Sequence, residues 1–160
     1  MRFLRLIIKP LAALFILALI IVAGGLAYYQ PPLADAPGIG TRMLRYLSGA
    51  PVETAKYSAY PELRMKDFPR AREEVFNAAV SAAQAMEWEI VSVDAEAFHL
   101  EALASYPIPE IKGRIRVEIR ETDEGLSALY VRSDTVGPWP DFGANTRRVV
   151  DYYDKIELFL

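Results

Sequence analysis

The first thirty residues contain one long apolar stretch. No charged residue lies between Pro10 and Ala34, and the segment 11–29 reads LAALFILALIIVAGGLAYY. At a helical rise of about 1.5 Å per residue, these 19 residues span roughly 28 Å, close to the hydrocarbon thickness of a bilayer. The pattern therefore predicts a single transmembrane helix, and a membrane as a partner through residues 10–29.

A cleaved signal peptide is the alternative interpretation of this stretch. A basic start, an apolar middle and the small residues Gly25 and Ala27 would satisfy a signal peptidase. However, the apolar segment is longer than the roughly 7 to 15 residues of a usual signal sequence, and Tyr28 and Tyr29 lie where an interfacial aromatic belt is expected. These two features favour a retained anchor.

The distribution of basic residues predicts the orientation of this anchor. Arg2, Arg5 and Lys9 precede the apolar segment, whereas Arg42 and Arg45 follow it only after a gap. Because positive charge is retained on the cytoplasmic side, we expect a cytoplasmic amino terminus and a periplasmic body, in a bacterial inner membrane.

Residues 31–61 are rich in proline and glycine, which disfavour long regular elements. The segment is predicted to be a linker between residues 1–30, which form the anchor, and a domain over residues 62–160. Within it, Thr41–Ser48 fits two turns of an amphipathic helix, with Met43, Leu44 and Leu47 on one side and Arg42 and Arg45 on another. Such a helix either lies on lipid headgroups or packs on the folded domain.

The remaining chain alternates between two periodicities. Helical spacing of apolar residues covers 69–86 and 141–159, and short apolar or alternating runs cover 88–93, 98–104, 114–121 and 126–133. The order helix, four strands, helix predicts an α+β fold, a two-layer sandwich of an antiparallel four-stranded meander with both helices on one face. Leu63–Phe68 is a candidate fifth, edge strand.

Three motifs in the last hundred residues carry a family resemblance. They are AAQAMEWEIVSVD at 82–94, LYVRSDTVG at 129–137 and DFGANTRRV at 141–149. Through them, residues 60–160 resemble the bacterial family called domain of unknown function 1499. The chain departs from the family pattern at Lys112-Gly113-Arg114 and at Asp134-Thr135. The resemblance implies a fold unit found near membranes and supplies no activity.

Composition excludes several kinds of site. The chain has no cysteine, which excludes disulfides, thiolate zinc sites and cysteine nucleophiles, and its single histidine, His99, excludes multi-histidine metal sites. We therefore expect no metal and no cofactor. Three of the 18 basic residues precede the apolar stretch and all 21 acidic residues follow it, so the body is acidic and nucleic acid is excluded as a partner.

Nucleophilic and acid–base catalysis find little support. A triad would need His99, which is predicted to lie on an ordinary sheet face, and no Gly-x-Ser-x-Gly or phosphate-binding glycine loop is present. The acidic pair Asp123 and Glu124 falls in a predicted turn, where such residues are usually solvated.

The loop before the last helix is the better candidate for a site. Asp141, Asn145 and Arg148 fall at the helix start, where free amides favour an anion, and Arg132 and Ser133 are expected to converge on it. The structural alternative, which we favour, is that Asp141 caps the helix, Asn145 fixes the loop and Arg148 forms a salt bridge to the sheet.

Loop aromatic residues form a second candidate surface. Tyr106 lies in a proline-rich connection with two isoleucines, and Trp139 and Phe142 flank Pro140. If exposed, these side chains suit a protein or lipid partner; otherwise they fill the edge of a small domain. The leading hypothesis is thus a membrane-anchored envelope protein acting as a non-catalytic accessory or binding module. A lipid or small-molecule carrier and, less favoured, a hydrolase using Asp141, Asn145 and Arg148 are the alternatives, and no oligomeric state is predicted.

Overall fold

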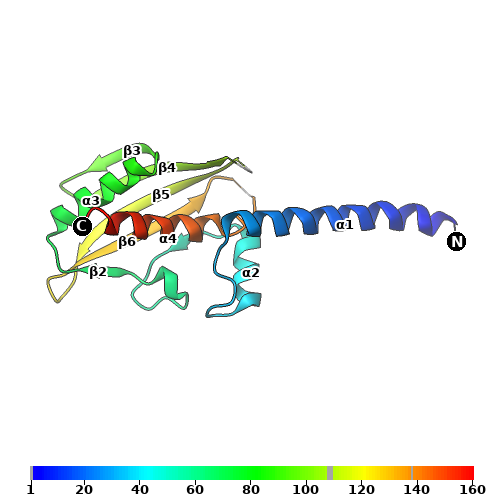
Figure 1. Ribbon diagram of the computed structural model, residues 1–160, viewed down its shortest axis with the longest axis horizontal. Coiled ribbons are helices and arrows are strands. Elements are labelled where there is room, and N and C mark those ends of the chain that lie inside the picture. The colour runs from blue at the N-terminus through cyan, green and yellow to red at the C-terminus, as the bar shows by residue number, and fades with distance from the viewer. Residues whose placement is uncertain (1, 108–109, 138) are drawn as a thin grey trace.

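The protein consists of a long helix that projects from a two-layer α+β body (Figure 1). The computed structural model describes the backbone of residues 2–107, 110–137 and 139–160, and the side chains of residues 8–105, 112–137 and 139–160. In chain order the elements are α1 (Arg2–Tyr29), α2 (Ile39–Ser48), β1 (Val52–Glu53), the short 3-10 helix η1 (Pro61–Leu63), β2 (Lys66–Phe68), α3 (Arg72–Ala85), β3 (Glu89–Asp94), β4 (His99–Pro107), β5 (Glu110–Glu121), β6 (Ser127–Thr135) and α4 (Ala144–Glu157).

The sheet is antiparallel, with the strand order β1-β6-β5-β4-β3. The predicted meander from β3 to β6 is therefore confirmed. The candidate edge strand is β2, whose residues Lys66–Phe68 pair with Leu129–Ser127 of β6. The same edge of β6 also receives β1, at Val52↔Ser133 and Glu53↔Arg132. The short strands β2 and β1 thus pair one after the other along the outer edge of β6.

Apolar and polar side chains alternate along the strands, so the sheet has one buried face and one solvent-exposed face. Leu100, Val117 and Val131 share a register position on β4, β5 and β6, and all three are fully buried. Helices α3 and α4 cover this face and complete one core, to which α3 contributes Val75 and Phe76. The opposite face carries charged pairs, among them Arg114–Glu101, Arg116–Asp134 and Arg120–Glu118.

Two strands are longer than the sequence predicted. The segment containing Tyr106 was expected to be a proline-rich loop, yet β4 continues to Pro107 and β5 begins at Glu110. Tyr106 pairs with Ile111 in the register, so it lies in a strand. The prediction was wrong because strand pairing across the hairpin outweighs the turn preference of the prolines.

The predicted linker packs on the body over much of its length. Helix α2 begins at Ile39, slightly before the expected start, and ends at Ser48, followed by Gly49, which adopts the left-handed conformation (φ 64°). Val52 of β1 is buried in the main core. The turn at 54–65 is tied back by backbone hydrogen bonds from Ala55 to Leu63 and from Met65 to Ala55. The polypeptide therefore passes from α1 into the body without a free tether.

Candidate functional site

Asp141 caps the amino end of α4. Its Oδ1 accepts the N–H of Gly143 at 3.2 Å and its Oδ2 accepts the N–H of Asn145 at 3.0 Å, and the carboxyl group is buried. Burial raises the pKa of Asp141, and the two backbone hydrogen bonds oppose that shift. The helix begins at Ala144 rather than at Asp141 because Phe142 and Gly143 have positive φ angles, 50° and 88°.

Ser133, Asn145 and Arg148 form a buried network beside this cap. Ser133 Oγ donates to Asn145 Oδ1 at 2.9 Å, and Asn145 Nδ2 donates to Thr135 Oγ1 at 2.8 Å. Arg148 Nη1 donates to Asn145 Oδ1 at 2.6 Å and lies 3.5 Å from Ser133 Oγ. The network thus ties the first turns of α4 to β6, and Ser133, Asn145 and Arg148 are fully buried within it.

Gly113 of β5 makes room for the Arg148 guanidinium. A Cβ atom added at this glycine would lie 2.3 Å from Arg148 Nη1, too close for any side chain without displacing the arginine. The close approach explains a glycine in the middle of a long strand. The Arg148 guanidinium packs on the backbone of β5 at Gly113 and donates hydrogen bonds to the Ser133 hydroxyl and the Asn145 amide oxygen. The expected salt bridge from Arg148 to the sheet stays a prediction.

Arg132 does not join this cluster, although the sequence placed it there. It precedes Ser133 on β6, and successive side chains of a strand point to opposite faces. Arg132 instead pairs with Asp134 and with Glu53 of β1, both at 3.2 Å, on the exposed face of the sheet. The structure therefore brings together Ser133, Asp141, Asn145 and Arg148 but separates Arg132 from them.

The predicted aromatic surface is also divided. Phe142 is buried and packs with Tyr29 of α1 and Ala144 of α4, with Val22 at the edge of the cluster. Trp139 is 70% exposed. The side chain of Tyr106 lies outside the residues that the structure describes. Only Trp139 among the described members is thus available to a partner.

The carboxyl end of α1 docks directly on the start of α4. A Cβ atom added at Gly25 would lie 2.6 Å from Phe142 Cγ, so the ring rests on the bare helix backbone. One turn later, Tyr29 is buried in the same cluster, and beyond it the ring of Pro31 lies against Gly143. This contact was not predicted, because Gly25 was considered only as a small residue of a cleavage site.

Helix α1 is long and apolar enough to cross a membrane. Ile8–Tyr29 has 22 residues and a mean hydropathy of 2.6, and only 6% of its most apolar window is buried. Large side chains from Leu11 to Ile21 are more than half exposed on all sides. This exposure is unlike that of the core helix of a soluble protein.

Arg42 of α2 is the most extensively bonded buried side chain outside the α4 cluster. It is fully buried, and its guanidinium donates to Glu62 Oε1 at 2.6 Å and Oε2 at 3.0 Å. It also donates to the Tyr46 hydroxyl and to the backbone carbonyls of Pro32, Asp35 and Ala36. The hydrogen bonds to Glu62 raise the pKa of Arg42, so the guanidinium stays charged although it is buried. The sequence pattern put Arg42 and Arg45 on one side of the helix, away from the apolar residues, and left open whether the helix lies on headgroups or packs on the body.

Helix α2 consequently has its polar side turned inward. Arg42 and Tyr46 are buried against the body, whereas Ile39 is 63% exposed and Leu44 is 75% exposed. Leu47 continues the exposed apolar side one turn further. We refer to Ile39, Leu44 and Leu47 as the outer face of α2.

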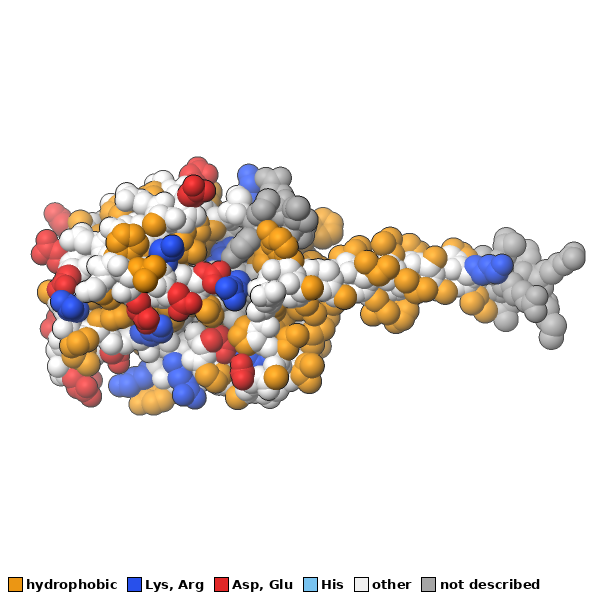
Figure 2. All heavy atoms as spheres, viewed as in Figure 1, with side chains coloured by type: hydrophobic (Ala, Val, Ile, Leu, Met, Phe, Trp, Pro, Cys, Tyr) orange, Lys and Arg blue, Asp and Glu red, His pale blue; other side chains and the backbone are white. Residues whose placement is uncertain are grey.

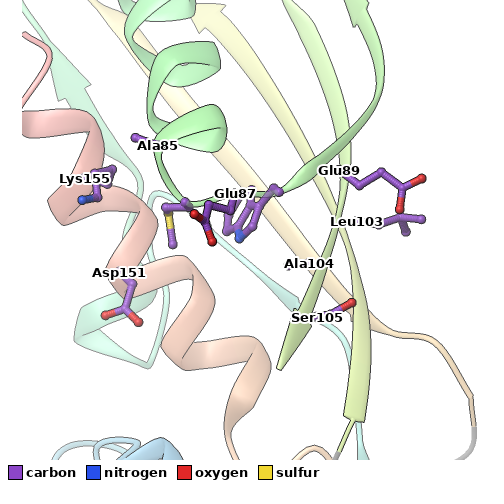
Figure 3. Close-up of a pocket in the computed structure, with 10 residues that line it drawn as sticks. Ala85, Glu87, Glu89, Leu103, Ala104, Ser105, Asp151 and Lys155 are labelled. Carbon is purple, nitrogen blue, oxygen red and sulfur yellow. The ribbon is translucent and has the colours of Figure 1, made fainter. Parts of the chain in front are cut away.

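An open groove lies between α4 and the edge of the sheet. It has a volume of about 570 Å³, and its lining comes from the carboxyl end of α3, the turn into β3, β4 and α4. Figure 3 shows Asp151 and Lys155 on α4 at one side, Leu103 and Ser105 on β4 at the other, and Glu87 between them. Trp88 lines the groove with its ring stacked on Tyr152 at 4.8 Å between centroids. Sequence reasoning did not predict this groove, because its polar side chains come from four separate elements.

Comparison with known proteins adds no relative. No protein-family model matches the chain, and no curated protein matches it. Within the described residues, no group of three or more His, Asp or Glu side chains is placed to hold a metal ion.

Proposed function

We propose that the protein is a single-pass membrane protein of the bacterial envelope that holds a non-catalytic binding or accessory module against the membrane surface. The docking of α1 on the body through Gly25, Tyr29 and Phe142 is the observation that carries this proposal. A helix whose remaining length is apolar and exposed needs lipid around it, and one fixed to its domain positions that domain at the lipid surface.

The same contact supports a retained anchor over a cleaved signal peptide. Cleavage after Ala27 would remove Val22 and Gly25 from the cluster and would expose the ring of Phe142 to water. The exposed ring would lose roughly 1.5 to 3 kcal/mol of burial free energy. The folded domain thus uses the end of the apolar helix as part of its own packing.

The orientation and compartment are inferred from charge. The basic residues before the helix favour a cytoplasmic amino terminus, which places the acidic body in the periplasm. The resemblance to the domain of unknown function 1499 family agrees with a location near membranes and is proposed on its three motifs alone.

A binding role is proposed over a hydrolytic one because of what the polar residues do. A hydrolase using Asp141, Asn145 and Arg148 would need an open cleft at the start of α4. These three side chains are buried, and among the described residues they form hydrogen bonds to one another, to β6 and to the backbone at the start of α4. Their role is structural, because these hydrogen bonds hold the start of α4 to β6.

A small-molecule binding role is the second candidate, and the groove beside Trp88 favours it. The groove is large enough for a small ligand, and it combines an aromatic ring with Glu87, Asp151 and Lys155. Its open, charged lining suits a polar ligand or a peptide segment better than the acyl chain of a lipid.

Three measurements test the proposal. Mass spectrometry of the chain extracted from membranes is expected to give the full-length mass, whereas a chain starting beyond residue 27 would contradict the anchor. An alkaline phosphatase fused after Leu160 is expected to be active, and activity only of a cytoplasmic reporter at that position would contradict the orientation.

The third measurement concerns the groove. Native mass spectrometry of the detergent-extracted protein is expected to show a bound component that Ser105→Trp, which fills the groove, abolishes. Ser92→Trp on the exposed side of β3 is the matched control and should retain it. Loss of the component from both variants, or from neither, would contradict binding in the groove.

A further inference from the structure

The outer face of α2 is exposed at the end of the body that meets the anchor. In Figure 1, α2 lies across the direction of α1, at the point where α1 leaves the body. Figure 2 shows hydrophobic side chains gathered over this end and acidic side chains over the opposite end. Trp139 adjoins α2, because its carbonyl group lies against Gly49 at the end of that helix.

An exposed apolar helix side backed by a buried ion pair is an unusual arrangement for a helix in water. Amphipathic helices on soluble domains turn their apolar side to the core, since each exposed leucine forgoes roughly 1.5 to 3 kcal/mol of burial. Here Arg42 occupies the inner side and is fixed there by Glu62 and by three backbone carbonyls. The helix cannot rotate without breaking these bonds, so Leu44 is held outward.

The length of α1 sets the depth of this surface. Contacts with the body begin at Val22, so the apolar helix is free of the body only from Lys9 to Val22, about 20 Å at 1.5 Å per residue. The hydrocarbon layer is about 30 Å thick. The missing distance, roughly 10 Å, must be covered by the part of α1 that is docked on the body. The α1-facing end of the body consequently lies at the depth of the headgroups and the first acyl carbons.

We propose that the outer face of α2 and Trp139 form a second membrane contact, inserted into the interfacial layer of the bilayer that α1 crosses. The inference rests on the proposed function, because it requires α1 to span that bilayer. The occupant is the lipid of that membrane: the surface is continuous with the apolar helix, and its tryptophan and leucines match the side chains that proteins place at the acyl boundary. The body is then fixed in orientation by two contacts.

The absence of cysteine from the chain makes a clean labelling experiment possible. Single variants Leu44→Cys and Leu47→Cys receive an environment-sensitive nitrobenzoxadiazole label in the full-length protein, reconstituted into phosphatidylethanolamine and phosphatidylglycerol vesicles. Leu158→Cys is the matched control, because Leu158 is 76% exposed, as Leu44 is 75% exposed, and lies near the carboxyl terminus at the far end of the body. Vesicles with brominated acyl chains then report lipid contact.

We expect a blue-shifted emission and quenching by brominated lipid for the labels at positions 44 and 47, and neither effect at 158. A label at 44 that behaves like the one at 158, in protein that floats with the vesicles, would overturn this inference and leave the anchor intact. A label shielded from water yet not quenched by brominated lipid would also overturn it and would indicate a protein covering the face. Protein that fails to float would defeat the anchor and the inference together.

Discussion

The buried pair of Arg42 and Glu62 allows a quantitative test of how residues 31–62 are held to the body. Glu62→Ala removes the carboxylate that accepts two hydrogen bonds from Arg42, at 2.6 and 3.0 Å, and leaves a fully buried guanidinium. The change adds no bulk and leaves every residue of the main core as it is. Its effect on stability therefore reports the ion pair itself.

The expected loss in the free energy of unfolding depends on the hydrogen bonds that Arg42 still forms in the variant. Removing one partner of a buried ion pair typically costs about 3 to 5 kcal/mol, because the other charge is left uncompensated. Arg42 still donates to three backbone carbonyls and to the Tyr46 hydroxyl, so the lower end, about 3 kcal/mol, is expected. At about 4 °C per kcal/mol for a domain of this size, Tm should fall by about 12 °C.

Glu74→Ala is the matched control. Glu74, in the first turn of α3, accepts a hydrogen bond at 2.9 Å from Arg70, which lies just before the helix, and both side chains are 48% exposed. An exposed ion pair contributes only about 0.2 to 1 kcal/mol, so Tm should change by about 4 °C or less.

Thermal unfolding of the full-length protein in detergent, followed by near-ultraviolet circular dichroism, measures both variants. Trp88 stacks on Tyr152 in the core and supplies a signal for the folded body. If Glu62→Ala lowers Tm no more than Glu74→Ala does, the reasoning that the buried pair fixes this segment is refuted.

Two further predictions concern the anchor contact and the cap of α4. Gly25→Ala places a methyl group against the Phe142 ring and should weaken docking of α1 by about 1 to 3 kcal/mol, so proteinase K should cleave residues 30–38 faster. Gly24→Ala is the control, because no atom lies within 4 Å of its Cβ, and it should leave the cleavage rate unchanged. Equal cleavage rates for the two variants would contradict the docked anchor. Because burial raises the folded-state pKa of Asp141 above its ordinary 3.8, the carboxyl group contributes stability below that value and loses it as pH rises through the raised pKa. Urea unfolding of Asp141→Asn across this range should show the stability of the native protein falling relative to the variant as pH increases, and a constant difference would exclude the effect.

The meander and its two helices were predictable because local periodicity decides them. Ile115, Val117 and Ile119 alternate with charged residues, and a one-residue shift would turn all of them to water. The separation of Arg132 from Ser133 follows from the same rule, so the sequence already contained the signal against their convergence. The role of Asp141 as a helix cap could also be predicted, because a helical pattern follows it in the sequence.

The remaining features depend on contacts between segments far apart in the chain. The two residues of β1 have no periodicity to detect, and they form a strand only because the edge of β6 is available. The role of Phe142 depends on a glycine more than a hundred residues earlier, on another helix. The partners of β1 and of Phe142 could therefore not be predicted from residue spacing or composition.

Helix α2 shows why an amphipathic pattern alone is not sufficient. The same residues permit two solutions, one with the leucines inward and one with Arg42 inward, and the choice depends on Glu62 and on the carbonyls that the loop at 32–36 supplies. In water the second solution would combine the desolvation of a charge with the exposure of apolar side chains. In the proposed membrane contact, lipid covers Leu44 and Leu47, so their exposure no longer costs free energy. The buried ion pair then has a consequence beyond its own stability, because its hydrogen bonds hold both leucines toward the lipid.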